Sequence, residues 1–301
     1  MIELGRLKAL WAVAQYGTVT AAAGLLHCTP SAISQHLAKL ERETGSVLVE
    51  KDGRGLRLTG AGRVLADKAA LVLAAVEEAE SALAAHHGSL SGPVRLAAFP
   101  TACRGLLPHA LMSLAAHYPE LAPTLRESDP RVSLDLLRQG EIDVALVDDW
   151  PEVALEFLPG ISHTELGLDV ADLVVPADHE LATAGPRAPV RLMDVRGQRW
   201  IASTPGAICH EWLLRVLPGV KPDFLVAEFE TQLTLIAAGL GIALIPRLAR
   251  MPLPEGVVVL PVAPAPSRRV TATWRSASGA RPVVGVAVAA LRAAWESSQA
   301  V

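Results

Sequence analysis

The hydrophobic positions of the first sixty residues recur at the spacing of short amphipathic helices. The first stripe consists of Leu4, Leu7, Leu10, Trp11 and Ala14. It predicts a helix over residues 4–14, because positions three and four apart share one helical face. After Gly17, Thr20 is expected to cap a second short helix. The small residues Ala22 and Ala23 within it would let another helix approach closely.

A third helix is predicted over residues 30–44, where both ends are marked. Thr29 can accept hydrogen bonds from the free amides of the first turn, Pro30 suits the first helical position, and Gly45 suits the end. One face is apolar, with Ile33, Leu37 and Leu40. The other face carries uncharged hydrogen-bonding groups near the helix start: Ser31, Ser34, Gln35 and His36.

Two helices joined by a tight turn, the second with a capped start, are typical of helix-turn-helix DNA-binding proteins. In such proteins the second helix lies in the major groove and its first turns contact base edges. Gln35 could then pair with adenine through two hydrogen bonds, and a serine could bond to a base or a phosphate. The alternative is that this polar row is the solvated face of an ordinary bundle helix.

Residues 47–59 predict a β-hairpin, because two short β-prone runs flank Asp52 and Gly53. Basic side chains near its tip suit contact with DNA phosphates, which add affinity without sequence information. A charged hairpin alone is usually solvated, but its place directly after a helix-turn-helix favours a wing. The predicted DNA contacts are Thr29, Ser31, Ser34, Gln35, His36, Lys39, Lys51, Arg54 and Arg57.

The charge of the chain is divided unevenly. Residues 1–60 hold seven Lys or Arg against five Asp or Glu, a net charge of +2, whereas the whole chain of 301 residues carries -4. A basic head on an acidic body is a weak indication of a module that binds a polyanion, joined to one that binds something else. No signal peptide or membrane span is expected, which indicates a cytoplasmic protein.

The three cysteines, Cys28, Cys103 and Cys209, are widely spaced and fit a reducing compartment as buried thiols. Cys209 stands beside His210, but adjacent residues do not readily bind one tetrahedral ion, and no further ligand spacing supports a site. No metal and no cofactor are therefore expected.

The stretch after the hairpin predicts a long helix with an apolar seam. The seam consists of Leu65, Ala69, Val72, Val76, Ala79 and Leu83. Steps of four and three residues are typical of the a and d positions of a coiled coil. Either two chains pair along this seam or it packs against the chain's own domain, and residues 86–93 then supply a hinge.

From residue 94 onward, predicted strands alternate with predicted helices in two βαβ groups. The expected strands are 94–99, 123–127, 142–147, 172–176, 199–203, 223–229 and 242–246, and the expected helices are 106–117, 132–139, 208–217 and 232–238. This order predicts two α/β subdomains with largely parallel sheets. Ligands of such sheets bind beyond the carboxyl ends of the strands, where hydroxyls and free helix amides gather.

The run "AAAGLLHCTPSAISQHLAKLERETGSVLVEKDGRGLRLTGAG" resembles the winged helix-turn-helix of LysR-type transcriptional regulators. The matching positions are Ala22, Ala23, Leu26, Ser34, Leu37, Leu40, Glu41, Gly45, Leu48, Leu58, Thr59, Ala61 and Gly62. The family often has Arg where this chain has Gln35 and an aromatic residue where it has Val49, and Pro30 lies one place earlier than the family's commonest proline. The segments "GEIDVALV" and "AAGLGIALIP" resemble the family's effector domain, itself similar to periplasmic solute-binding proteins.

The resemblance implies an α/β multidomain protein: a winged helix-turn-helix, a linker helix that pairs two chains, and two effector-binding subdomains of solute-binding-protein type. The last strand, around "VTATW", and the helix 283–297 would return to the first subdomain. The implied boundaries are 1–60 for the head, 61–92 for linker and hinge, and 93–301 for the effector domain, with subdomains 93–162 plus 267–301 and 163–266.

The implied effector-binding residues are Pro100, Thr101, Ala102, Ser128, Ser203 and Thr204. Four acids at strand ends, Asp148, Asp149, Glu228 and Glu230, favour a cationic effector such as a basic amino acid. Further implied partners are an operator in double-stranded DNA, a second or further copies of the chain as a homodimer or homotetramer, and RNA polymerase.

Two other functions compete with this hypothesis. An enzyme could close two α/β lobes over a substrate, but the chain contains no H-E-x-x-H, G-x-S-x-G or phosphate-binding P-loop motif. A solute-binding transport protein would share the cleft, but it would need export and no basic head. We therefore expect a sequence-specific transcriptional regulator controlled by a small effector, and not an enzyme.

Overall fold

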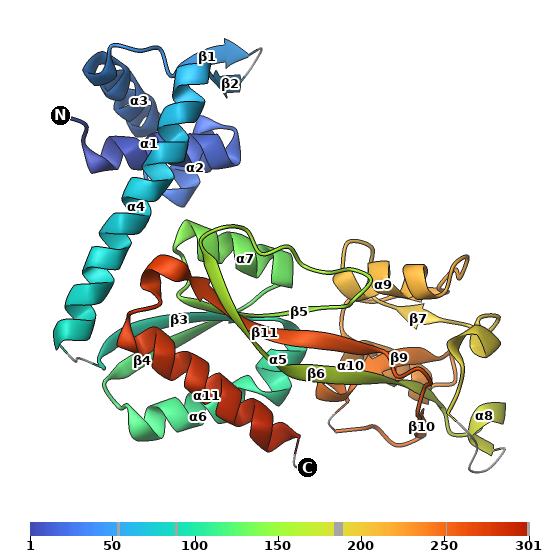
Figure 1. Cartoon of the computed structure of the whole chain (residues 1–301). Helices are drawn as coiled ribbons and strands as arrows, with labels where there is room; N and C mark the ends of the chain where they lie inside the picture. Colours follow the sequence, from blue (N-terminus) through green and yellow to red (C-terminus); the bar gives the residue numbers. More distant parts are fainter. Residues whose placement is uncertain (53–54, 88–89, 184–188, 251, 300–301) are drawn as a thin grey trace. The chain divides into compact units, whose positions relative to one another are not determined.

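The computed structural model describes residues 1–52, 55–87, 90–183, 189–250 and 252–299 (Figure 1). The chain divides into two compact units, Met1–His87 and Gly88–Val301. The first unit contains α1 (Leu4–Tyr16), α2 (Val19–Leu25), α3 (Pro30–Thr44), β1 (Val49–Asp52), β2 (Gly55–Leu58) and α4 (Gly60–His87).

The helix boundaries in the head follow local chemistry. Thr29 caps α3 by accepting a bond from Ala32 N at 3.2 Å, and Gly45 ends it in the left-handed conformation, as predicted. The predicted cap of α2 at Thr20 is wrong. Thr18 caps this helix and accepts from Ala21 N at 3.1 Å, because the left-handed Gly17 ends α1 and the chain re-enters a helix at once.

The hairpin of β1 and β2 is joined to α3 and α4 by three specific contacts. Glu41 on α3 accepts hydrogen bonds from Leu48 N at 2.8 Å and Val49 N at 3.2 Å. Thr59 donates to Val47 O at 2.7 Å and accepts from Gly62 N at 3.0 Å at the start of α4. A Cβ at Gly62 would lie 2.0 Å from Leu48 O, so only glycine permits this approach. The family motif residues therefore fix the hairpin against the reading helix.

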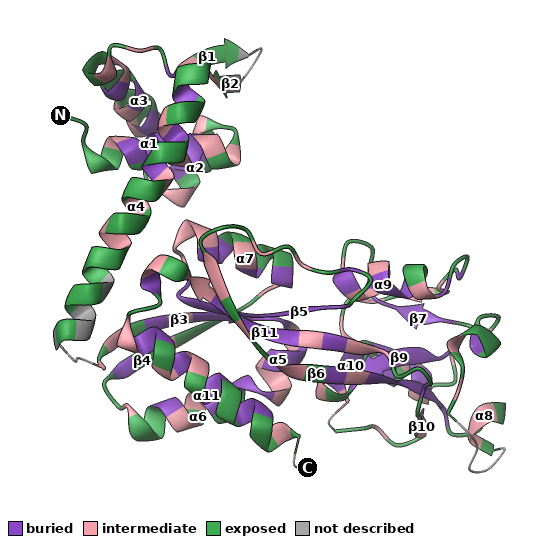
Figure 2. Ribbon diagram, viewed as in Figure 1, coloured by how far each residue is buried: buried purple, intermediate pink, exposed green. Residues whose placement is uncertain are grey.

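The seam predicted along α4 has two parts. Ala69 is fully buried and Leu65 packs on the head core, where α4 contacts α1, so this part is covered by the chain itself. Farther along, Val72 is 42% and Leu83 is 61% exposed (Figure 2). The self-packing alternative thus holds for the first turns, and the exposed apolar positions begin at Val72.

The second unit is built on a seven-stranded sheet in the order β10-β6-β11-β5-β3-β4, with β9 also pairing β6. Its strands are β3 (Gly92–Ala98), β4 (Leu121–Glu127), β5 (Val144–Asp149), β6 (Ile161–Pro176), β9 (Ala243–Pro246), β10 (Val257–Leu260) and β11 (Ser267–Arg275). The strands β4, β3 and β5 are parallel, and β11 runs antiparallel between β5 and β6. The long strands β6 and β11 are the two crossings between the subdomains.

Helices cover both faces of this sheet (Figure 1). In the first half, α6 (Leu107–His117) and α11 (Pro282–Ser298) pack on one face, and α7 (Pro130–Gln139) packs on the other. The remaining elements are α5 (Pro100–Gly105), α8 (Glu180–Thr183), α9 (Ile208–Val216), α10 (Phe229–Ala237), the two-stranded sheet of β7 (Ile201–Ala202) and β8 (Phe224–Leu225), and the 3-10 turns η1 (Leu192–Val195), η2 (Arg247–Ala249) and η3 (Ser276–Ser278).

The strand pairing of the second subdomain differs from the prediction of a largely parallel sheet. Both β9 and β10 pair antiparallel with β6, whereas parallel contacts are limited to β7 with β8 and to the bridges Trp200 with Ile242 and Val190 with Val262. The reason is the length of β6, which has 16 residues and extends from the first subdomain into the second. It runs in the direction opposite to β9 and β10.

Candidate functional site

The exposed face of α3 carries most of the predicted base-contacting residues. Ser31, Gln35 and Lys39 are exposed at successive turns, opposite the buried Ile33, Leu37 and Leu40. Ser34 is exposed too, but its hydroxyl donates to Pro30 O at 3.0 Å, so only its lone pairs remain for a partner. This face offers hydrogen-bonding groups without a fixed partner, chiefly Gln35.

Two predicted DNA contacts have other roles in the free head. Thr29 uses its hydroxyl as the cap of α3, although the residue stays exposed. His36 is partly buried, and its Nδ1 atom is buried without a hydrogen-bond partner among the described residues. Arg42, which the sequence reasoning missed, is exposed seven positions after Gln35, and its Nε donates to Ala38 O at 3.2 Å.

Among its described residues, the hairpin presents one unpaired and one paired cation. Lys51 is exposed on β1. Arg57 lies opposite Glu50 in the strand register, and their side chains form an ion pair at 2.6 Å. The predicted contact Arg54 lies outside the described residues. The surface pair is weak and open to exchange with a phosphate, since exposed ion pairs contribute about 0–1 kcal/mol.

The body contains a buried arginine at the carboxyl ends of β3 and β5. Arg268 on β11 is 3% exposed and donates to Asp169 Oδ2 at 2.8 Å, Asp148 Oδ2 at 3.1 Å and Thr101 Oγ1 at 2.6 Å. Its guanidinium carbon lies 4.9 Å from the centre of the Phe99 ring. All three polar partners come from different segments, so Arg268 joins the first subdomain to the crossing strand β6.

Two carboxylates share one guanidinium in this cluster. Burial raises the pKa of Asp148, although Arg268 beside it acts in the opposite direction. Asp148 is therefore a carboxylate of this cluster that gains a proton more readily than an exposed aspartate as the pH falls. Asp169 has an additional donor, Leu248 N at 3.2 Å.

A second polar group lies at the end of β7. Ser203 is 4% exposed, and its Oγ receives Gln232 Nε2 at 3.2 Å and lies 3.0 Å from Cys209 Sγ. The His210 ring bonds to Ser203 O through Nδ1 at 2.7 Å. Burial raises the pKa of the Cys209 thiol, and the neighbouring Asp148 charge raises it further. The charges of both Asp148 and Arg268 act on the pKa of Cys209, so the Ser203 group lies close to the Arg268 cluster.

The predicted effector residues divide into those that meet in this region and those that do not. Thr101 and Ser203 are brought there by Arg268 and Cys209. Ser128 shares a hydrogen bond of 2.7 Å with Ser133, as a local contact at the start of α7. Ala102 is buried in the core of the first subdomain, Pro100 begins α5, and Thr204 is exposed.

The acids that suggested a cationic effector are all paired with arginines. Asp148 pairs with Arg268, and Asp149 pairs with Arg269 at 2.7 Å. Glu228 and Glu230 both pair with Arg104, at 3.5 and 3.2 Å. Because each of these four carboxylates already has an arginine partner, although Glu228 and Glu230 share one, the acid count alone gives no support to a basic amino acid as effector.

Two arginine contacts join the rims of the region. Arg131 at the start of α7 forms two hydrogen bonds of 2.9 Å with Glu211 on α9 and a third of 3.2 Å with Gly206 O. This pairing lowers the pKa of Glu211. Arg104 on α5 reaches Glu228 and Glu230 at the start of α10. These ion pairs connect α5 and α7 to α10 and α9 in this structure.

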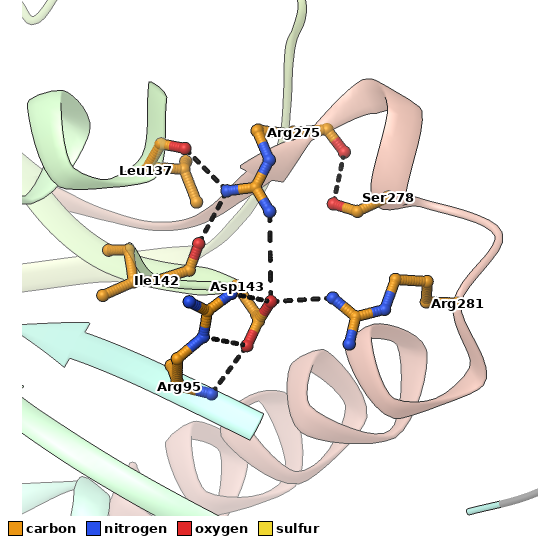
Figure 3. A network of polar contacts seen from close by, with 7 residues as sticks. All are labelled: Arg95, Leu137, Ile142, Asp143, Arg275, Ser278 and Arg281. Atoms are coloured by element: carbon orange, nitrogen blue, oxygen red, sulfur yellow. Dashed lines mark hydrogen bonds and ion pairs between the residues drawn. The ribbon is translucent and has the colours of Figure 1, made fainter. Parts of the chain in front are cut away.

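A separate network of charges lies at the opposite, amino-terminal ends of β3 and β5 (Figure 3). Asp143 is 1% exposed, bonds to Arg95 Nη2 at 3.0 Å and Arg281 Nη1 at 2.7 Å, and has Arg275 at 3.9 Å. Hydrogen bonds from these arginines lower its pKa, although burial opposes them. This network ties the strands to the start of α11 and lies away from the cleft.

Sequence reasoning missed Arg268, Asp169 and Gln232. The signal for Arg268 was present, because in "SRRVTATW" it falls on the same strand face as Val270 and Ala272, both buried. A cation on an apolar strand face needs buried acids. Gln232 had no comparable signal, since a single polar residue at the start of a helix is ordinarily solvated.

Membrane-spanning helices and metal sites are the two remaining features that bear on the site. Among the described residues, no helix is long and apolar enough to cross a membrane. The described part of the chain also contains no group of three or more His, Cys, Asp or Glu side chains placed to bind a metal.

Comparison with known families covers both units. Residues 4–63 match the model of the bacterial regulatory helix-turn-helix protein, lysR family, and residues 87–296 match the LysR substrate binding domain. The DNA-binding transcriptional dual regulator OxyR of Escherichia coli K12 is 30% identical over 285 residues, which cover 91% of this chain and 90% of OxyR. A probable hydrogen peroxide-inducible genes activator of Mycobacterium leprae is 29% identical over 91% of this chain and 88% of its own.

Solved structures agree with this assignment. A full-length OxyR variant from Pseudomonas aeruginosa aligns with a TM-score of 0.70 at 22% identity, over 97% of this chain and 95% of that one, which shows a shared fold. A hydrogen peroxide-bound OxyR variant from Corynebacterium glutamicum aligns with a TM-score of 0.62 at 26% identity, over 100% and 96%. The match over both units shows that the chain belongs to the LysR family of DNA-binding transcriptional regulators, with an N-terminal helix-turn-helix and an effector-binding domain.

Proposed function

We propose that this chain reads a partly symmetric operator through α3 and steadies itself on the phosphates through the hairpin. The observation that carries the proposal is the exposed, uncharged Gln35 face of α3, which Glu41 holds in fixed relation to β1. Gln35 and Ser31 would contact base edges, while Lys39, Lys51, Arg54, Arg57 and Arg42 would contact phosphates. Residues 1–60 would form the reading module.

The exposed part of the α4 seam supports pairing of two chains. Val72, Val76 and Leu83 continue the heptad spacing beyond the turns that the head covers. We assign residues 61–92 to this pairing and hinge, as a homodimer or as the building unit of a homotetramer. The regulator would act on RNA polymerase in the cytoplasm, and we place no catalytic step in it.

The effector domain, residues 93–301, would signal through its cleft. Subdomain 93–162 plus 267–301 and subdomain 163–266 meet at Arg268, Thr101 and Ser203, where a bound molecule could change their closure. A difference in affinity between open and closed forms is what would shift the regulator. Effector binding there is taken to be non-covalent.

Thiol chemistry supports a non-covalent effector. Some relatives are named for hydrogen peroxide, and peroxide reacts with a thiolate. In this chain burial raises the pKa of Cys103 to about 11 and also raises that of Cys209. The two cysteines of the body are therefore protonated thiols at neutral pH, which makes them poor peroxide sensors.

The test of the proposal is selection of DNA. Purified full-length protein is incubated with random duplexes at about 150 mM salt. At this concentration the salt screens the phosphate charges and weakens non-specific binding. We expect enrichment of one motif with approximate two-fold symmetry. We also expect the protein to retard DNA from the gene's own upstream region in a gel-shift assay. Failure to enrich any motif, with equal retardation of random DNA, would refute sequence-specific reading.

A further inference from the structure

A small cavity lined mainly by the second subdomain contains polar donors that no described residue satisfies. Its volume is about 20 Å³, which is room for one water. Six residues supply its chemistry: Trp150, Ser203, Cys209, Trp212, Phe229 and Gln232. Apolar residues of β7, α9 and β9 complete the wall, so no charged side chain lines the cavity.

The first unsatisfied donor is the indole N–H of Trp150. Trp150 is 2% exposed, and its Nε1 atom has no hydrogen-bond partner among the described residues. By contrast, two buried tryptophans of the second subdomain have acceptors: Trp212 Nε1 donates to Glu152 at 2.8 Å, and Trp200 Nε1 donates to Val195 O at 3.2 Å. A buried donor without an acceptor is destabilising, so its retention calls for a partner.

The second unsatisfied donor belongs to the pair of Ser203 and Cys209. The pair carries one hydroxyl and one thiol hydrogen, and the contact of 3.0 Å between Oγ and Sγ uses only one of them. Gln232 adds another donor to Ser203 Oγ and no acceptor for the remaining hydrogen. The cavity therefore faces two donors at its polar end.

The charges near the cavity are saturated by one another. Arg268 donates hydrogen bonds to Asp148, Asp169 and Thr101. Its charge is therefore not available to bind an anionic ligand. Asp148 is likewise engaged by Arg268, so no free carboxylate awaits a cationic one. A charged ligand would lose its hydration here without gaining a partner.

The apolar end of the cavity suits a flat molecule. The rings of Trp150 and Trp212 are stacked with centroids 4.0 Å apart and an angle of 18° between their planes, and Phe229 lies on the same wall. Aromatic walls favour planar partners through stacking and burial. The cavity is narrow in the closed cleft, so a ligand larger than water requires the Arg131–Glu211 rim to part.

We propose that this cavity is the recognition subsite of the effector cleft and that it takes an uncharged, planar molecule whose carbonyl-type oxygen accepts hydrogen bonds from Trp150 Nε1 and the Ser203–Cys209 pair. The inference rests on the proposed function, because it names the class of effector that the cleft would bind. An uncharged planar effector also takes the place of the basic amino acid that the four acids at strand ends suggested.

Four probes of nearly equal shape test the charge and the acceptor separately. Benzamide is neutral with a carbonyl oxygen, benzoate is its anionic analogue, benzamidine is its cationic analogue, and toluene has no acceptor. Each is titrated into the full-length protein by calorimetry. We expect benzamide to bind at least about tenfold more tightly than each of the others, equivalent to about 1.4 kcal/mol.

Two variants locate the donor. Trp150→Phe keeps an aromatic wall and removes the unsatisfied N–H, so the preference for benzamide over toluene should fall from about tenfold to less than about threefold. Trp200→Phe is the matched control, because it removes an indole N–H that is already bonded and does not line the cavity. Whatever its effect on stability, it should leave the ratio of the two affinities unchanged.

The outcomes separate this inference from the proposed function. Benzoate or benzamidine binding as tightly as benzamide, an unchanged ratio in Trp150→Phe, or no benzamide binding up to its solubility limit would each overturn it, the last meaning that the cavity holds only water. Motif enrichment from random DNA is measured on the same preparation. If enrichment persists while the probe results fail, the ligand class is wrong and the regulator is not.

Discussion

At the scale of single residues, the body depends on Arg268. Its guanidinium is buried and faces two aspartates that are themselves no more than 6% exposed. Removal of one member of a buried ion cluster leaves the others without compensation, which costs more than the cluster contributes net. The cluster therefore matters as a constraint on how β11 joins β6 and Thr101.

Arg268→Met should lower the free energy of unfolding of the body by about 3–5 kcal/mol, because Asp148 and Asp169 stay buried without their cation. Urea denaturation followed by circular dichroism measures this. The matched control is Arg269→Met on the neighbouring strand position. Its side chain is 42% exposed and Asp149 keeps a bond from Leu155 N at 2.8 Å, so we expect a loss of about 1 kcal/mol. Equal losses in both variants would contradict the assigned role.

The Cys103 thiol gives a prediction that depends on pH. Burial raises its pKa from 9.0 to about 11, so alkylation by iodoacetamide should be slow at pH 7 and rise about tenfold per pH unit up to that value. Between pH 9 and 11 the unfolded chain loses this proton while the folded chain keeps it, so stability falls over that window. Mass spectrometry follows the rate, with the exposed Cys28 as the internal comparison. Rapid modification of Cys103 at pH 7 would contradict the burial argument.

At the scale of elements, sequence pattern predicted what local chemistry determines. The ends of α3 followed from Thr29, Pro30 and Gly45, and the hairpin followed from its turn residues. The pattern did not predict the full length of β6, because its first half alternates weakly and only its final apolar run reads as a strand. It also missed β10, whose four residues are all partly buried.

The same limit explains the site. Strand ends pointed to Thr101, which bonds to Arg268, and to Ser203, which bonds to Cys209. The pairing of acids with Arg104, Arg268 and Arg269 depends on contacts between residues up to 126 positions apart, which no local pattern contains. Charge counted along the sequence therefore suggested a cationic effector that the folded chain does not support.

The contact between α7 and α9 predicts a latch on the cleft. Arg131→Glu should part the rim by repulsion from Glu211, and the double variant Arg131→Glu with Glu211→Arg should restore it. Hydrogen exchange at α9 should rise in the single variant and return in the double one. The pair is partly exposed, so a coupling energy of about 0.5–1 kcal/mol is expected, smaller at high salt. Equal hydrogen exchange at α9 in the single and the double variant would contradict the role of this pair as a latch.

At the scale of the whole molecule, the proposed reading of a partly symmetric operator requires two heads. The apolar positions of α4 from Val72 onward would supply the surface for pairing. Val76→Asp with Leu83→Glu should convert the dimer to monomers in analytical ultracentrifugation. The carboxylates of the two paired helices would repel one another and would lose their hydration in the interface. Glu78→Ala, an exposed change on the same helix, should leave the mass unchanged. A dimer that survives the double change would place the interface elsewhere.

The central claim is that the Gln35 face reads bases while the hairpin contacts phosphates, and the salt dependence of DNA affinity tests it most directly. Affinities for the selected motif and for a shuffled duplex are measured over a salt series with Gln35→Ala and Lys51→Ala. Gln35→Ala should weaken motif binding by about 1–3 kcal/mol and leave shuffled binding and the salt slope unchanged. Lys51→Ala should weaken both and reduce the slope by about one. Equal weakening of motif and shuffled DNA by Gln35→Ala would contradict the account.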